Sequence, residues 1–230
     1  MADEETDFSP AAACGMMRAM TLPATPRLRG VLHQYAFFAA VAAGTVLVVL
    51  ADGLRERLAV WIYAVALAAM LGASALYHRF PWRTAAARLR ARRVDHAMIF
   101  VFIAGTYTPF ALLAFGGALR VVVLATVWGG AALGLALELA WIDSPRWLSA
   151  FAYLGVGWVG VVAVPELFSQ GVAVGVLVVV GGGLYTVGAL AYATTWPNPF
   201  PATFGFHEVF HLLVVAAAAT QFVAVSLVVV

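Results

Sequence analysis

Apolar residues gather in seven long runs along the chain, and short polar breaks separate these runs. Each run has about 20 residues, the length that a helix needs to cross a hydrocarbon core of ~30 Å. The runs do not alternate between apolar and polar positions, as the strands of a membrane β-barrel would. We therefore predict seven transmembrane helices, over residues 31–50, 58–78, 95–115, 119–141, 147–168, 172–193 and 206–230.

The composition supports this pattern. Hydrophobic residues make up 64% of the 230 residues and charged residues only 10%, whereas an ordinary soluble domain is about 45–50% apolar and ~25% charged. The formal net charge of +2 is too small to indicate a nucleic-acid partner. We expect an all-α integral membrane bundle of seven helices, embedded in a membrane and without a second globular domain.

The first part of the chain differs from the rest. It begins with an acidic segment and carries Pro10, Pro23 and Pro26, so it lacks the basic start and apolar centre of a signal peptide. We interpret residues 1–29 as a flexible N-terminal tail and residues 30–230 as the seven-helix domain. Cys14 is the single cysteine and cannot form a disulfide within the chain.

Arginine placement predicts the orientation, because short basic loops stay in the cytoplasm. Seven spans put the tail on the same side as the second, fourth and sixth loops. That side has ten arginines: Arg18, Arg27, Arg29, Arg79, Arg83, Arg88, Arg90, Arg92, Arg93 and Arg146. The other side has Arg55, Arg57 and Arg120. We predict a cytoplasmic N-terminus and an external C-terminus.

The stretch 79–93 is basic and rich in alanine. It could form a short surface helix against anionic lipid headgroups. The plainer interpretation is that its arginines only fix the topology of the neighbouring spans.

Polar side chains of three predicted helices lie at one membrane depth. They are Ser74 and His78 at the cytoplasmic end of the second helix, Asp95 and His96 at the start of the third, and His207, Glu208 and His211 at the start of the seventh. Ionisable side chains in a hydrocarbon layer are costly unless they are paired or bound. Their convergence indicates a functional site.

The histidines suit a metal ion. His207 and His211 are four residues apart, so both can face one ion from the same side of a helix. With His78 they form a three-nitrogen set that suits zinc and leaves a fourth position open, as in catalytic zinc sites. Asp95 could orient or deprotonate a water there, and Ser74 could donate a hydrogen bond to it or to a substrate oxygen. Alternatively, Asp95 could only cap its helix and pair with a nearby arginine.

The remaining polar residues of the spans have plainer interpretations. We interpret His33 and His96 as interfacial or hydrogen-bonded residues, and Glu208 as a solvated residue at a helix start. Glu138 and Glu166 are assigned to the outer ends of their helices and are left out of the site.

Three segments together resemble the signature regions of the hemolysin III family, the bacterial branch of the superfamily that includes the adiponectin receptors. These segments are 74–78 (SALYH), 93–110 (RVDHAMIFVFIAGTYTPF) and 207–211 (HEVFH). The resemblance extends over all seven helices in order.

The resemblance implies a seven-helix protein of the bacterial inner membrane with a cytoplasmic N-terminus. It implies zinc bound by His78, His207 and His211, with Asp95 holding the water at the metal and Ser74 in the same site. In the wider superfamily, similar sites are associated with hydrolysis of lipid amides such as ceramide. A membrane lipid is therefore the expected substrate or ligand.

Three functions stay open at this point. The first is a zinc-dependent hydrolase of membrane lipid amides or esters, with Asp95 and Ser74 as catalytic residues. The second is a non-enzymatic receptor, membrane-homeostasis protein or cytolytic protein in which zinc only holds helices together. The third is an intramembrane metalloprotease, because His207, Glu208 and His211 fit the HExxH pattern. The sequence does not indicate an oligomeric state.

Overall fold

The computed structural model describes residues 25–230, so Cys14 and most of the predicted tail lie outside the described residues. Helices form nearly all of this part of the chain. They are Val31–Leu50 (α2), Leu54–Arg79 (α3), Ala85–Pro109 (α4), Gly117–Ala140 (α5), Arg146–Gly157 (α6), Val164–Ser169 (α7), Val172–Thr194 (α8) and Phe206–Val229 (α9). A π-helical turn, Phe110–Ala114, extends α4, and a 3-10 helix, Trp158–Ala163, joins α6 to α7.

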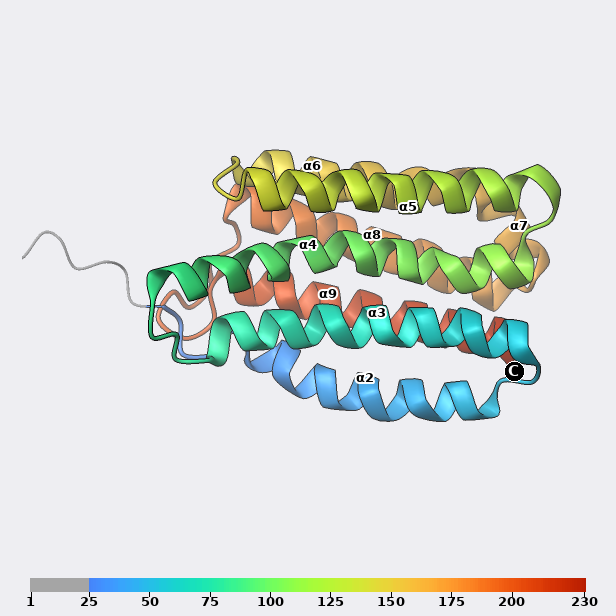
Figure 1. Ribbon diagram of the computed structural model, residues 1–230, viewed down its shortest axis with the longest axis horizontal. Helices are drawn as coiled ribbons and strands as arrows, with labels where there is room; N and C mark the ends of the chain where they lie inside the picture. The colour runs from blue at the N-terminus through green and yellow to red at the C-terminus, as the bar shows by residue number, and fades with distance from the viewer. Residues whose placement is uncertain (1–24) are drawn as a thin grey trace, which may run out of the picture.

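Seven helical stretches in the described residues are long and apolar enough to cross a membrane. Figure 1 shows them as roughly parallel rods, with α6 and α7 following one another along one rod. This confirms the predicted all-α class and the number of spans. Two spans begin earlier than predicted, at Leu54 and Ala85. The hydropathy pattern marks only the apolar part of a helix, whereas both helices extend into charged sequence.

The basic stretch 79–93 is not a separate surface helix. From Ala85 onward it is the first part of α4 and continues into the span without a break. Thr84 begins this helix as its N-cap, because its hydroxyl accepts a hydrogen bond from the backbone N–H of Ala87 at 3.1 Å. Four arginines of the stretch, Arg88, Arg90, Arg92 and Arg93, therefore lie on a helix that continues into the third span, whereas Arg79 ends α3 and Arg83 precedes Thr84.

The N-terminal segment and the α8–α9 connection, which were predicted to share one side of the membrane, do meet at one end of the bundle. The backbone N–H groups of Arg27 and Leu28 donate to the carbonyls of Ala202 and Thr203 in the α8–α9 connection, both at 3.1 Å. Residues 25–29, assigned above to the tail, are thus hydrogen-bonded here. We call this the polar end of the bundle. Its cytoplasmic orientation stays a prediction.

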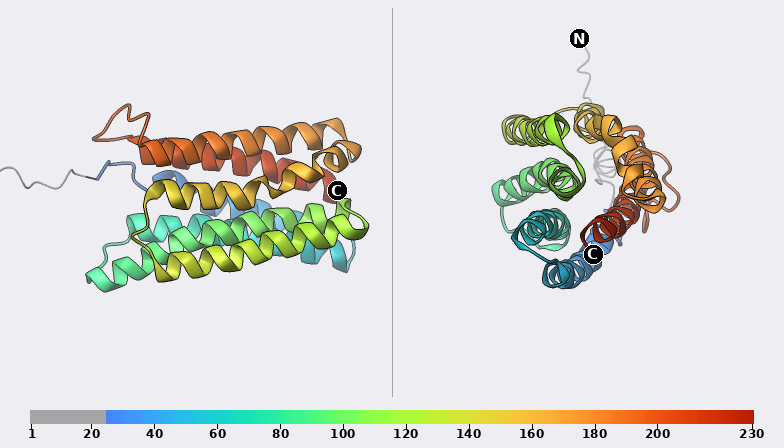
Figure 2. Two further views of the ribbon diagram at one scale, coloured as in Figure 1. Left: turned by 90° about the horizontal axis from the view of Figure 1, so that it is seen from above. Right: turned by 90° about the vertical axis from the view of Figure 1, so that its right-hand side faces the viewer.

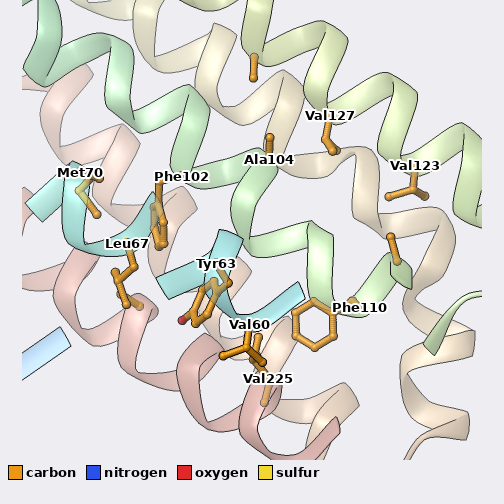
Figure 3. Close-up of a cluster of buried hydrophobic side chains, with 14 of the residues drawn as sticks. Val60, Tyr63, Leu67, Met70, Phe102, Ala104, Phe110, Val123, Val127 and Val225 are labelled. Carbon is orange, nitrogen blue, oxygen red and sulfur yellow. The ribbon is translucent and has the colours of Figure 1, made fainter. Parts of the chain in front are cut away.

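Helix α9 has a central position in the packing. It contacts α2, α3, α4 and α8, and Figure 2 shows it among these helices in the end-on view. Towards the opposite end from the polar connections, the interior is a cluster of apolar and aromatic side chains that includes Tyr63, Phe102, Phe110 and Val225 (Figure 3). This cluster anchors the helices that carry the polar residues.

A close approach sets the spacing of α3 and α4. A Cβ atom built on Gly105 of α4 would lie only 2.5 Å from the Cβ of Ala66 on α3. Small residues let helix backbones approach closely, which favours van der Waals packing where no hydrophobic driving force acts between helices. The contact holds the two helices side by side, so their polar ends lie next to each other.

Candidate metal centre

The three predicted metal ligands lie together. His78 is in the last turn of α3, His207 is in the first turn of α9, and His211 follows one turn later. One ring nitrogen from each histidine can be chosen so that all three lie within 4.8 Å of one another. The Nε2 atoms of His78 and His207 are 3.2 Å apart. These histidines are close enough to hold one metal ion.

The distances fit tetrahedral binding. Two nitrogens bound to zinc at ~2.0–2.1 Å with tetrahedral angles lie about 3.4 Å apart, close to the 3.2 Å between His78 and His207. His211 is 2% exposed, and its Nδ1 has no hydrogen-bond partner among the described residues. A buried polar atom without a hydrogen-bond partner needs an explanation, and an ion or ligand that belongs to the site would provide one. The donor set therefore fits a metal ion, and its identity as zinc stays a prediction.

Asp95 and Ser74 lie beside the histidines, on the side of α4 and α3. Asp95 Oδ2 is 3.6 Å from His78 Nε2. Ser74 is 2% exposed, and its hydroxyl approaches the Asp95 carboxylate without a well-formed hydrogen bond. All five residues singled out from the sequence are thus brought to one place. A carboxylate and a hydroxyl beside three imidazoles can orient a water and a polar ligand group.

His33 is a fourth histidine of this site that the sequence analysis missed. Its ring stacks on that of His211, with centroids 3.7 Å apart and an interplanar angle of 10°. It is 3% exposed, and neither ring nitrogen has a hydrogen-bond partner in the described part of the chain. The interfacial interpretation of His33 is wrong, because the first helix turns this side chain into the bundle. One signal was available: its position near the start of the first span is at the same predicted depth as the other histidines.

A glycine fixes the path of the chain beside the metal ligands. Gly30 has φ +77°, a left-handed conformation that glycine adopts readily. A Cβ atom at this position would lie 2.5 Å from the Cβ of His78. The turn into α2 therefore packs directly against a candidate ligand.

Glu208 is not solvated, which corrects its interpretation above. It is 1% exposed, and its Oε1 accepts a hydrogen bond from Arg29 Nε at 2.5 Å. Its Oε2 accepts from the backbone N–H of Gly205 at 2.8 Å. The carboxylate thus caps α9 and pairs with the segment that precedes α2. Both of its oxygens are already bound, so it is poorly placed to serve as a base at the metal.

Glu138 lies at the polar end, and its assignment to the outer end of its helix is wrong. Successive spans run in opposite directions, so α5 ends at the side where α4 begins. Glu138 is fully buried, and its Oε1 accepts hydrogen bonds from the hydroxyls of Ser149 at 2.9 Å and Tyr153 at 3.2 Å. Its Oε2 is 3.4 Å from Nδ1 of His96. This cluster joins α4, α5 and α6 next to Asp95.

Comparison with known proteins identifies relatives over most of the chain. A family model described as "Haemolysin-III related" matches residues 23–222. A protein of Bacillus subtilis (strain 168) named "Hemolysin-3 homolog" is 36% identical over 131 residues, which are 56% of this chain and 58% of that protein. "Hemolysin-3" of Bacillus cereus is 34% identical over 131 residues, 56% of this chain and 57% of its own length. The chain thus spans under three fifths of these two relatives.

A more distant relative is matched over a longer stretch. The human "Monocyte to macrophage differentiation factor" is 25% identical over 201 residues, which are 84% of this chain and 79% of that protein. The likeness therefore extends well beyond the part aligned with the two Bacillus proteins.

Proposed function

Because the chain belongs to the hemolysin III family, we propose that this multi-pass membrane protein is a zinc-dependent hydrolase of membrane lipid amides or esters. The observation that supports this most is the convergence of three imidazoles, one carboxylate and one hydroxyl at the polar end of the bundle. We place this end at the cytoplasmic face of a bacterial inner membrane, as the arginine distribution favours.

Each side chain has a role in this proposal. His78, His207 and His211 hold the metal. Asp95 orients the attacking water and accepts its proton, since its carboxylate is 3.6 Å from His78 Nε2. Ser74 donates a hydrogen bond to the carbonyl oxygen of the substrate as negative charge develops on it. A bound zinc ion would act as a Lewis acid and would lower the pKa of water, so that the water loses a proton and becomes nucleophilic at neutral pH.

The burial of the site supports a lipid as substrate. Ser74, Asp95 and His211 are 2%, 7% and 2% exposed. They also lie near the ends of spanning helices. The bond between the headgroup and the acyl chain of a lipid lies at about this depth in a bilayer. A substrate of this class would have its scissile bond at the depth of the site while it remained in the membrane.

The protease alternative has less support. Its general base would be Glu208, whose two carboxylate oxygens bind Arg29 and the backbone of Gly205. A receptor, membrane-homeostasis or cytolytic role with a structural metal predicts the same three ligands but no turnover. That difference separates it from the hydrolase by experiment.

The test compares metal content and turnover in purified protein. Elemental analysis of the wild type should find about one zinc per chain, and His78→Ala should lose it. A panel of lipid amides and esters should reveal hydrolysis by the wild type. Asp95→Ala should retain zinc and lose hydrolysis. If zinc-loaded protein hydrolysed no member of the panel, while chelation lowered its thermal stability, the structural role would replace the hydrolase.

A further inference from the structure

A groove of about 310 Å³ lies between α3 and α4. The methyl groups of three alanines, Ala73 on α3 and Ala87 and Ala91 on α4, line it. Ala87 and Ala91 are four residues apart and thus share one helix face. The groove is hollow because these side chains are small while their neighbours are large.

Larger side chains bound the groove. Leu76 and Val94 also line it, and they are 52% and 48% exposed. Trp82 lines it too, and its indole Nε1 donates to the carbonyl of Tyr77 at 3.0 Å, which fixes the ring. Arg90 is the charged residue of the lining. The lining of the groove is therefore apolar except for the guanidinium of Arg90.

The groove lies on the outer surface of the same helices that carry the metal centre. Ala73 precedes the buried Ser74, and Val94 precedes the buried Asp95. Ala91 is one helical turn before Asp95 and shares its face of α4, so the groove lies next to the metal centre. None of the three candidate metal ligands lines the groove.

The segment around the groove is strongly positive. Residues 79–94 contain six arginines and no acidic residue. Several of these arginines have protein partners: Arg79 donates to Gln34, Arg88 lies over the Tyr77 ring and Arg92 pairs with Asp143. Arg90 is exposed and forms no side-chain hydrogen bond or ion pair with a described residue. Its guanidinium is available to an anion.

We propose that this groove binds an anionic phospholipid of the bilayer, with an acyl chain along the alanines and the lipid phosphate at Arg90. A guanidinium suits a phosphate because its N–H groups form paired hydrogen bonds with two oxygens. Tryptophan and arginine near the end of a spanning helix lie at headgroup depth. Neither the metal centre nor the proposed hydrolysis is needed for this site, so the two proposals stand or fall separately.

Lipid binding by the purified full-length protein tests the site. Native mass spectrometry from detergent counts bound dioleoyl phosphatidylglycerol, with dioleoyl phosphatidylcholine as the zwitterionic reference. Arg90→Ala should weaken phosphatidylglycerol binding about fivefold, the equivalent of the ~1 kcal/mol that one arginine contributes near an anionic surface. Glycerol phosphate without chains should not compete, since the groove supplies apolar contacts.

Two variants separate the groove from general electrostatics. Arg83→Ala removes the same charge from the same segment, and Arg83 does not line the groove; this variant should bind phosphatidylglycerol nearly as the wild type does. Ala91→Leu fills the groove without changing charge and should weaken binding as Arg90→Ala does. If Ala91→Leu has a low melting temperature, Ala87→Leu is a second variant that fills the groove.

The proposal fails on any of three results. Equal losses in Arg83→Ala and Arg90→Ala would indicate diffuse attraction to the basic segment. Unchanged binding in a folded filling variant would exclude the groove. Equal affinity of the wild type for phosphatidylcholine and phosphatidylglycerol would exclude recognition of the anionic headgroup.

Discussion

The imidazole of His33 lies parallel to that of His211, 3.7 Å from centroid to centroid. This contact joins the first turn of α2 to a candidate metal ligand on α9. Groups that orient a metal ligand affect metal affinity, typically by 10- to 100-fold. His33 is therefore expected to matter for the metal although it is not one of the three ligands.

Replacement of His33 distinguishes stacking from a role of its nitrogens. We expect His33→Ala to weaken cobalt or zinc binding about tenfold, because the His211 ring loses its support. His33→Phe keeps a flat ring and should retain most of the affinity. Metal titration of the purified protein measures both. Equal losses in the two variants would show that a nitrogen of His33, and not its ring face, is required.

Asp95→Asn keeps the size of the side chain and removes its charge. We expect lipid hydrolysis to fall by about 10²- to 10⁴-fold, as for loss of a general base, with metal content unchanged. Elemental analysis and a turnover assay on one preparation check this. Loss of the metal together with turnover would instead make Asp95 a ligand or an essential support of the ligands.

Glu138 should contribute to stability through the residues that it joins. Glu138→Ala leaves the hydroxyls of Ser149 and Tyr153 without their buried acceptor, which costs about 1–3 kcal/mol. Thermal unfolding in detergent should show a clear decrease in midpoint. Glu166→Ala is the matched control, because Glu166 lies on α7 and its carboxylate bonds to no described side chain. Similar melting of both variants would contradict a stabilising role for the cluster.

The pair of Arg29 and Glu208 should hold the N-terminal segment to α9. Arg29→Ala leaves a buried carboxylate with only its backbone partner, so we expect a loss of about 1–3 kcal/mol. Arg27→Ala is the control, since Arg27 is exposed and contacts the α8–α9 connection through its backbone.

Glu208→Gln should keep the metal and any lipid turnover. A protease would instead lose its peptide hydrolysis in that variant, because Glu208 would be its general base.

Gly30→Ala should disturb the metal centre although Gly30 is not one of the candidate ligands. The added Cβ would lie 2.5 Å from the Cβ of His78 in a left-handed backbone conformation. Either the backbone at position 30 becomes strained or His78 is displaced, so we expect a lower melting temperature and weaker metal binding. Gly129→Ala is the control, because no atom lies within 4 Å of its Cβ position. Unchanged metal affinity in Gly30→Ala would mean that the turn can shift without moving His78.

The sequence predicted the spans and the five polar residues because both leave strong signals. Apolar length marks a span, and ionisable residues such as His78 and Asp95 stand out in apolar sequence. The start of α4 was missed because its arginines lie in helix beyond the apolar run. His33 was missed because its stacking depends on how α2 packs against α9, which no local pattern encodes. Glu208 was misjudged because its partner Arg29 is far away in the sequence.

Among the described residues, the buried histidines and carboxylates all lie at one end of the bundle. The histidines, Asp95 and Glu138 lie at one end, whereas the interior beyond them contains side chains such as Tyr63, Phe102 and Val225. An ion that crossed the bundle would have to pass this cluster of apolar and aromatic side chains. In the part of the chain that the structure describes, no buried charged side chain continues the polar site towards the other end. A path for ions across a single copy would lack ligands beyond the metal centre, whereas chemistry on a lipid needs only the groups gathered at this end.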